Sequence, residues 1–417
     1  MANPEEYLPP PFMDDFLERF LIEDLKLPRP IDIDKLETSG AYHTIYNISY
    51  PPSSLSSILQ AFPKLPTHDG RNLILRISGH HLPSLKTINE CAIMSYVASA
   101  TSIPVPGVVR YSADTTNALG HEYQLFTRAA GVSVDKVYAD FSTAQTIGFL
   151  DQIIDILAQL HALPFSHIGG LRFAHPSDMR GSIPVSEVAV LPGPVCEETF
   201  WQEPEIERYW NTPYGLNDTI ETLNIKGPFP TYVAYISAHV GKHIYAISLH
   251  PLMQAYRDLV PKLQNFLAVI NANQEGWQLN KTRIVLTHRD LHMGNIMYDW
   301  ATSRITGVLD WEFGGCVPLP LWNKKLPFFW NTDHTHPVES TATKMRWVQM
   351  FCDRCKERRI DPTTLIDDGY ENSKQEAMQT IQTYVRAICE VVPRGTAEGS
   401  VKSWKKVVEE HLEVFLD

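Results

Sequence analysis

The stretch IVLTHRDLHMGNIMYDWATSRITGVLDWEFGG, residues 284–315, is the most informative part of the chain. An apolar strand-like run, IVLT, leads into a polar loop that contains Asp290 and, five residues later, Asn295. Two more strand-like runs follow, IMYD and ITGVL, with a turn at 300–303 between them and Asp310 at the end of the second. Because a hairpin brings its two open ends to the same edge, we expect Asn295 and Asp310 to lie close together.

These three residues suit phosphoryl transfer from ATP. The reaction needs a group that orients and deprotonates an acceptor hydroxyl, and ligands for metal ions that neutralise the polyphosphate. Asp290 is the expected catalytic base. The amide oxygen of Asn295 and the carboxylate of Asp310 are the expected magnesium ligands, since Mg²⁺ prefers oxygen. Taken singly, Asp290 and Asn295 are equally typical of turns, and Asp310 of a helix cap.

A zinc site is the less favoured interpretation of the histidines and cysteines. His288 and His292 lack the intervening glutamate of a HExxH zinc motif, so His288 is expected to brace the loop. Cys352 and Cys355 form a CxxC in a charged, helix-like context without a second pair at zinc-ribbon spacing, and we expect ordinary thiols there. Six cysteines in 417 residues are too few for a disulfide scaffold.

The order His-Arg-Asp-Leu-x-x-x-Asn, strand and metal aspartate is that of a kinase-type catalytic loop. The block resembles the catalytic core of the aminoglycoside phosphotransferase family of the protein-kinase-like superfamily, especially its fungal branch of small-molecule kinases. Three other stretches resemble that branch: NECAIMSYV followed by TSIPVPGVV, ILAQLHALPFSHIGGL, and VLDWEFGGCVPLPLW. The resemblance covers roughly residues 35–330 and implies ATP and Mg²⁺ as cofactors.

The phosphate loop implied by the resemblance lies near residues 37–46. The segment TSGAYHTIY holds a single glycine, so the backbone N–H groups of Ser39 and Gly40 would form a less open cradle than usual. Arg76, in NLILRIS, stands where a kinase has its phosphate-contacting lysine, and arginine is not equivalent to lysine. The alternative for Arg76 is a surface position on a strand.

Two more nucleotide contacts follow from the resemblance. Glu90, in INECAIMSYV, is the expected partner of Arg76, as the helix glutamate is of the kinase lysine. Its alternative is a solvated helix face. The segment YQLFTRAAG resembles the hinge between the lobes, in which Thr127 to Ala129 would offer backbone groups to the adenine edge.

We expect an α+β, bilobal kinase-like fold. Residues 1–30 would be an N-terminal extension with one short helix, and 31–130 a nucleotide-binding lobe with an antiparallel sheet and one main helix. Residues 131–417 would form a larger, mostly helical lobe with the catalytic loop, the metal site and acceptor-binding helices. The Pro- and Gly-rich stretch 164–230 is expected to be irregular with short helices.

Composition limits the partners. A chain of 417 residues with 44% hydrophobic side chains can bury a core, and a net charge of −12 disfavours nucleic acid and anionic membranes. No apolar run is long enough to span a bilayer and no secretory signal is evident, so we expect a cytoplasmic monomer or homodimer with a small-molecule acceptor. The acceptor could be cationic or hydroxylated. An acidic cluster could attract a cationic amine, as the substrates of the resembled family suggest, or be a solvated helix face: Glu197, Glu198, Glu203, Glu205 and Glu207.

The same block separates a small-molecule kinase from a protein kinase. Trp-Glu follows Asp310 in place of Phe-Gly, and no Ala-Pro-Glu anchors an activation segment. The favoured function is therefore transfer of phosphate to an alcohol group of a small molecule. A nucleotide-binding pseudokinase or regulator is the alternative, motivated by the single-glycine loop and Arg76. A third is a kinase-fold enzyme repurposed in a biosynthetic pathway. The acceptor and the choice between ATP and GTP stay open.

Overall fold

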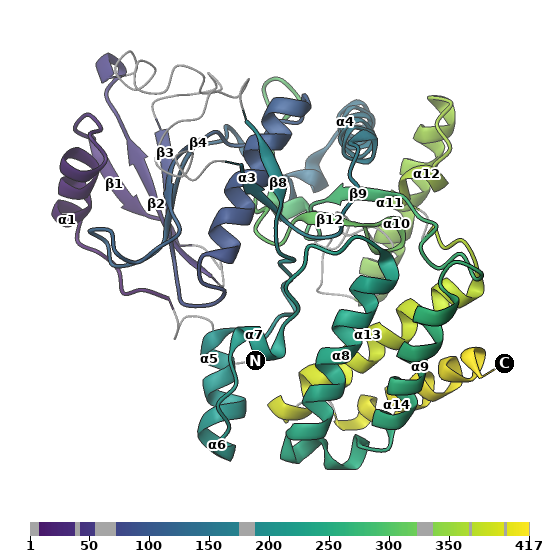
Figure 1. The fold of residues 1–417 in the computed structure, drawn as a ribbon. Helices are drawn as coiled ribbons and strands as arrows, with labels where there is room; N and C mark the ends of the chain where they lie inside the picture. Colours follow the sequence, from purple (N-terminus) through teal and green to yellow (C-terminus); the bar gives the residue numbers. More distant parts are fainter. Residues whose placement is uncertain are drawn as a thin grey trace.

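The computed structural model describes residues 8–37, 42–54, 72–174, 188–322, 337–366, 369–395 and 398–416, and the statements below concern these residues. A five-stranded antiparallel sheet of order β1-β2-β3-β5-β4 forms the first part of the chain (Figure 1). Its strands are β1 (Asp32–Lys35), β2 (His43–Ser49), β3 (Asn72–Ser78), β4 (Val108–Ser112) and β5 (Tyr123–Thr127).

Alternation along β3 gives this sheet two different faces. Leu73, Leu75 and Ile77 are fully buried against helix α1 (Asp14–Arg19) and the π-helical turn Phe20–Asp24. Since side chains alternate across a strand, Arg76 points to the opposite face. The expected N-terminal helix therefore packs on the sheet, and its packing determines which way Arg76 points.

Helix α3 (Leu85–Ala100) connects the sheet to the second part of the chain. It contacts β4 and β5, yet its buried apolar residues, Cys91, Ile93, Met94 and Val97, belong to the core formed with helix α4 (Thr143–Ala162) and with apolar residues between positions 285 and 317. The one main helix expected beside the sheet is thus also part of the second core.

Three small sheets lie in the second part of the chain, and strands of two of them flank the predicted catalytic loop. Strand β10 (Ile296–Asp299) pairs with β11 (Arg304–Val308) as the expected hairpin, and with β6 (Val132–Ser133). Strand β9 (Ile284–Thr287) pairs with β12 (Gly315–Pro318). The stretch 164–230 is mainly irregular, as predicted, with short elements: β7 (Leu171–Phe173), β8 (Val190–Pro192), α5 (Glu203–Ile206), α6 (Thr212–Tyr214) and α7 (Ile220–Leu223).

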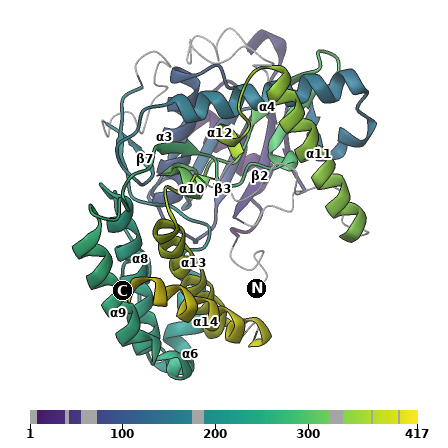
Figure 2. The same cartoon turned by 90° about the vertical axis from the view of Figure 1, so that its right-hand side faces the viewer.

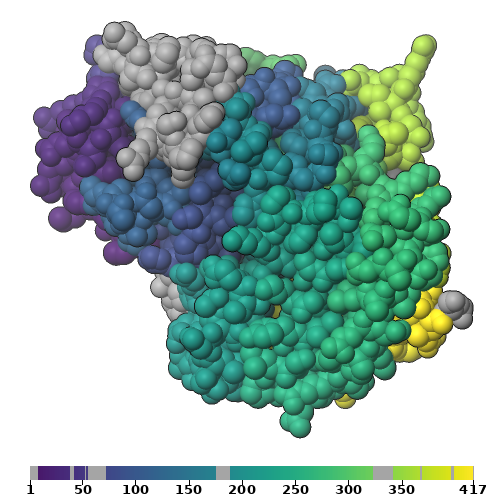
Figure 3. Space-filling model, viewed as in Figure 1, coloured from purple at the N-terminus to yellow at the C-terminus, as the bar shows by residue number. Residues whose placement is uncertain are grey.

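Long helices make up the rest. Figure 2 shows α8, α9, α13 and α14 as a group at the end of the molecule away from the sheet, and α11 beside α4. The remaining helices, long and short, are α8 Tyr232–Leu249, α9 Leu259–Asn273, α10 Leu319–Trp322, α11 Pro337–Glu357, α12 Thr363–Ile366, α13 Ser373–Arg394 and α14 Glu398–Leu412. In Figure 3 the purple and blue first part lies against the teal-to-yellow second part.

The predicted α+β bilobal fold is confirmed: an antiparallel sheet with one main helix precedes a larger, mostly helical part. Among the described residues, no helix is both long enough and apolar enough to span a membrane.

Candidate active site

The catalytic loop between β9 and β10 is held by the backbone of one residue, Leu309. His288 Nε2 lies 2.6 Å from the Leu309 carbonyl oxygen, and the Leu309 amide donates to the carbonyl oxygen of Asn295 at 2.8 Å. The side-chain amide of Asn295 donates to the backbone oxygen of Asp290 at 3.0 Å and to its Oδ2 at 3.3 Å. Because Asp310 follows Leu309, the structure brings the predicted base and both predicted metal ligands around one peptide group.

His288 has the contacts of a loop brace, in agreement with the prediction. Its Nδ1 accepts from the Asp290 amide at 3.3 Å, and its ring lies 4.5 Å from that of the fully buried Trp311. Burial lowers the pKa of His288, which favours the neutral ring that this pair of hydrogen bonds requires. Both ring nitrogens are therefore used within the protein.

Two residues of the site have left-handed backbone conformations, Arg289 at φ 67° and Asp310 at φ 66°. Non-glycine residues seldom adopt positive φ, and such strained residues cluster at functional sites where neighbouring contacts maintain them. Arg289 is held by Glu197 and Asp310 by Arg76, so each strained residue has an ion-pair partner.

Arg76 links the sheet to the metal-ligand candidate. Its Nη1 donates to Glu90 Oε1 at 2.6 Å and its Nη2 to Asp310 Oδ1 at 2.8 Å. Gln124 donates to the other Glu90 oxygen at 2.7 Å. The Arg76 side chain is 11% exposed and that of Glu90 is fully buried, so the alternatives of a surface strand residue and a solvated helix face are wrong.

The Arg76 charge also affects the acidity of Asp310. Burial alone would raise the pKa of this carboxyl, but the neighbouring guanidinium outweighs burial and holds the pKa of Asp310 below its usual range. Asp310 is thereby kept as a carboxylate, the form that a metal ligand requires.

Three further side chains form a group that resembles a metal site. Ligand atoms of His43, Glu90 and Glu312 lie within 4.8 Å of one another, all buried. The protein's own cations occupy the space between them: Arg76 Nη2 is 3.0 Å from His43 Nδ1, and Lys86 Nζ is 3.1 Å from Glu312 Oε2. We therefore interpret the group as a cluster of buried ion pairs beneath Asp310.

The nucleotide-side predictions are described in part. Ser39 and Gly40 lie outside the described residues. The Thr127 amide donates to the Gly107 carbonyl at 2.9 Å and its hydroxyl accepts from the Gly107 amide at 2.7 Å, so that amide serves the sheet. Ala129 packs against Gly307, where an added Cβ would come within 2.7 Å of the Ala129 methyl. A glycine in β11 thus makes room for the predicted hinge.

One residue that holds the catalytic loop was missed by sequence reasoning. Glu197, 3% exposed, accepts from Arg289 Nη1 at 3.1 Å and from the Tyr235 hydroxyl at 2.6 Å, with His239 Nε2 at 3.6 Å. Although burial opposes it, the positive charge of Arg289 and these donors hold the pKa of Glu197 well below its usual range. The irregular stretch is thereby joined to the residue before Asp290.

The acidic cluster does not act as one surface. Glu197 is buried against Arg289, and Glu205 receives two hydrogen bonds from the Arg394 guanidinium at 3.1 and 2.8 Å. Glu198 is exposed, and partial desolvation together with the negative charges of Asp290 and Glu390 raises its pKa. Glu198 is therefore close enough to Asp290 to be affected by its charge.

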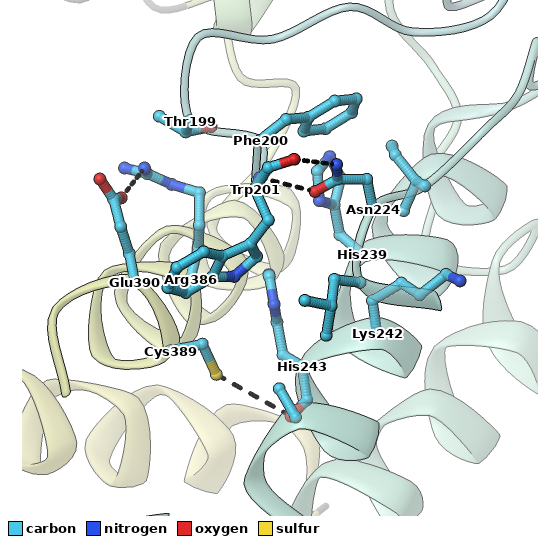
Figure 4. Close-up of a pocket in the computed structure, with 13 residues that line it drawn as sticks. Thr199, Phe200, Trp201, Asn224, His239, Lys242, His243, Arg386, Cys389 and Glu390 are labelled. Atoms are coloured by element: carbon cyan, nitrogen blue, oxygen red, sulfur yellow. Dashed lines mark hydrogen bonds and ion pairs between the residues drawn. The ribbon is translucent and has the colours of Figure 1, made fainter. Parts of the chain in front are cut away.

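A small cavity lies between the irregular stretch and helices α8 and α13 (Figure 4). In this view Asn224 bonds to the backbone of Trp201, Arg386 pairs with Glu390, and Cys389 reaches the His243 carbonyl. Its volume of about 30 Å³ leaves room for about two water molecules. This cavity is too small for a metabolite.

Comparisons with known proteins give the following likenesses. Two subtelomeric hrmA-associated cluster proteins, from two strains of Aspergillus fumigatus, are each 25% identical over 315 residues, covering 66% of this chain and 59% of theirs. The chain therefore spans less than two thirds of the length of these relatives.

Among solved structures, aminoglycoside phosphotransferase APH(4)-Ia with AMP-PNP and hygromycin B aligns at TM-score 0.46 and 14% identity, over 95% of this chain and 97% of that one. The streptomycin-ATP-APH(2")-IIa ternary complex aligns at TM-score 0.47 and 11% identity, over 98% and 100%. Both likenesses are too loose to support a conclusion.

The family model described as the phosphotransferase enzyme family, APH, matches residues 65–212 and 241–319, which together make up more than half of the sequence. These ranges include α3, α4, the catalytic loop and the segment after Asp310. The chain belongs to this phosphotransferase family.

Proposed function

We propose that this protein transfers the terminal phosphoryl group of ATP, with Mg²⁺, to a hydroxyl group of a small molecule. One observation carries the proposal: Asp290 and Asn295 gather around the Leu309–Asp310 peptide, while Arg76 reaches Asp310 from the sheet. A base, two oxygen ligands and a cation then meet at one place, as phosphoryl transfer requires.

The residues present fit a magnesium ion. The side-chain nitrogen of Asn295 donates to Asp290, so the side-chain oxygen points away from Asp290. Asp310 accepts from Arg76 at Oδ1, which leaves Oδ2 for a metal ion. An amide oxygen and a carboxylate oxygen are the hard ligands that Mg²⁺ prefers. When bound by Asn295 and Asp310, the ion would neutralise charge on the polyphosphate.

In the proposal, Asp290 acts as the base. Its side chain is 34% exposed, and its Oδ2 lies 3.5 Å from His292 Nε2. Although burial lowers it, the hydrogen bond to Asp290 and the charges of Asp290 and Asp310 raise the pKa of His292. The Asp290 side chain is the proposed proton acceptor. That carboxylate would take the acceptor's proton as the acceptor oxygen bonds to phosphorus and the bridging oxygen leaves with ADP.

The nucleotide would lie between the sheet and the catalytic loop. In the proposal, backbone N–H groups of the single-glycine loop and the Arg76 guanidinium contact the phosphates, Glu90 positions Arg76, and the hinge holds the adenine. The residues concerned are Ser39, Gly40, Arg76, Glu90, Thr127 and Ala129. Residues 31–130 would thus bind the nucleotide and 131–417 the acceptor.

A cationic or hydroxylated acceptor is supported by Glu198. The negative charges of Asp290 and Glu390 raise the pKa of this exposed carboxyl, after desolvation and against the opposing charge of Arg289, so several carboxylates act on one another here. Negative potential in a cleft raises the local concentration of cationic ligands.

One observation favours the alternative of a nucleotide-binding regulator. The Arg76 guanidinium occupies one carboxylate oxygen of Asp310, at 2.8 Å, and so competes with a metal ion for that group. Retention of Asp290, Asn295 and Asp310 at one place favours the enzyme.

Mass spectrometry of small-molecule extracts incubated with protein, ATP and Mg²⁺ tests the proposal. Wild type should give a product heavier by one phosphate, and Asp290→Asn should reduce its formation about 100- to 10,000-fold while ATP binding persists. Near-normal transfer by Asp290→Asn would show that Asp290 is not the base. Binding of ATP by wild type with no phosphorylated product in any extract would favour the regulator.

A further inference from the structure

Three residues on one face of α3, Lys86, Asn89 and Glu90, reach the segment that carries the predicted metal aspartate. Positions i, i+3 and i+4 of a helix lie side by side. Lys86 Nζ is 3.1 Å from Glu312 Oε2, and the Asn89 side-chain nitrogen donates to the backbone oxygens of Glu312 at 3.0 Å and Gly314 at 2.8 Å. Glu90 reaches Asp310 through Arg76, as described above.

The surroundings of Asn89 are built around its amide. Its oxygen accepts from the Leu171 amide at 2.9 Å, so the 1%-exposed side chain is bonded at both ends. A Cβ at Gly170 would come within 2.2 Å of this oxygen. Asn89 therefore joins three segments, namely α3, the start of β7 and residues 312–314. A side chain larger than that of glycine at position 170 would collide with the Asn89 oxygen.

Burial of the Lys86–Glu312 pair costs desolvation free energy. The two side chains are 3% and 4% exposed, and the desolvation of two charges often outweighs their attraction, so apolar residues of similar size would serve packing as well. The pair also contacts Tyr42 and His43, at the start of β2. Lys86 Nζ lies 4.7 Å over the Tyr42 ring, and His43 Nδ1 is 3.8 Å from Glu312 Oε2. The Lys86–Glu312 pair therefore connects α3, the start of β2 and the segment after Asp310.

We propose that Lys86 and Asn89 are positioning residues that fix residues 310–314 against α3 and thereby maintain the left-handed backbone of Asp310. The inference rests on the proposed function, in which Asp310 binds the metal. Helix α3 is then unable to move away from the sheet without displacing the metal ligand. The part of ATP affinity that depends on Mg²⁺ should consequently depend on two side chains that contact neither ATP nor metal.

Calorimetry of ATP binding with and without Mg²⁺ tests this dependence in Asn89→Asp and Lys86→Met. Asn89→Asp keeps the shape and removes the donor. Each variant should reduce the gain in affinity due to Mg²⁺ about 10- to 100-fold, as loss of contacts behind metal ligands does. Lys86→Met combined with Glu312→Gln should lose less than the sum of the two single changes, because the residues form one pair.

The matched control is Asp151→Asn, which removes the partner of Arg354 and Arg358 between α4 and α11. It should lower the melting temperature and leave the magnesium-dependent gain unchanged. A gain that falls equally in Asp151→Asn would show that general destabilisation explains the effect and would overturn the inference.

Hydrogen exchange of the ligand-free protein separates this inference from the proposed function. Amides of residues 313–316 should exchange faster in Asn89→Asp than in wild type, and unchanged rates in the control support the local contact. Unchanged rates in Asn89→Asp would overturn the inference whatever the activity. Absence of magnesium-dependent ATP binding in wild type would instead contradict the proposed function, and accelerated exchange would still support the contact of Asn89 with residues 312–314.

Discussion

At the residue scale, Arg76 divides its contacts between two nitrogen atoms. Its two terminal nitrogens reach different carboxylates, Glu90 and Asp310, and one of them also meets His43. A planar fork supports such divided contacts, whereas an ammonium group is a single point charge. The arginine found where a kinase has lysine thus fits a site in which the cation also holds Asp310, the predicted metal ligand.

We expect Arg76→Ala to lower the free energy of unfolding by about 3–5 kcal/mol, because it leaves the buried Glu90 without its partner. ATP binding should weaken as well, and Glu90→Ala should weaken it less. The double variant should lose less than the sum, since the residues form one pair. Calorimetry and denaturant unfolding measure both effects, and strictly additive losses would place Arg76 outside the phosphate site.

The sequence predicted the Arg76–Glu90 and Asp290–Asn295 neighbours because both follow a known order of strand, helix and loop. It did not reveal that Glu197 pairs with Arg289, 92 positions away, or that Lys86 pairs with Glu312. A single carboxylate or ammonium in an irregular or helical stretch has no local pattern that names a distant partner. The sequence feature that could have pointed to Asn89 is its position next to Glu90 in NECAIMSYV.

At the element scale, a proline separates the helices α8 and α9. The stretch 231–272 contains two helices because Pro251 begins a 3₁₀ segment, where His250 Nδ1 accepts from the Leu252 amide. A proline lacks the N–H that a continuing helix needs. Pro251 is therefore the reason that α8 and α9 are separate helices.

The buried contact between the irregular stretch and the catalytic loop gives a prediction at this scale. Glu197→Gln leaves the Arg289 guanidinium without a counter-ion and should cost about 3–5 kcal/mol of unfolding free energy. Tyr235→Phe removes only a hydroxyl bond to the same carboxylate and should cost about 1–3 kcal/mol. Urea unfolding compares the two, and a smaller loss in Glu197→Gln than in Tyr235→Phe would contradict the assigned ion pair.

At the scale of the whole molecule, the family resemblance inferred from four motifs is confirmed by the family match, and the fungal branch stays a prediction. The bilobal order was predictable because strand and helix periodicities are local. The sharing of α3 between the two parts was not, because it depends on which face of the helix finds the second core.

Several buried histidines make the fold sensitive to acid. Burial lowers the pKa of His161, beside Trp322, to about 4. A base whose folded pKa lies below its unfolded value of about 6.5 binds its proton more readily in the unfolded chain, so stability is lost as the pH falls from about 6.5 to 4. His161→Asn should reduce the slope of unfolding free energy against pH in this window by up to about 1.4 kcal/mol per unit. An unchanged slope by urea titration at several pH values would mean that His161 is not buried in its neutral form.

The central claim is that Asp310 holds the metal through which this protein engages ATP. Calorimetric titration of ATP into wild type and Asp310→Ala, each with Mg²⁺ and with a chelator, tests it most directly. The account predicts that Mg²⁺ strengthens binding to wild type and has no effect on Asp310→Ala. An equal strengthening in both proteins would contradict it.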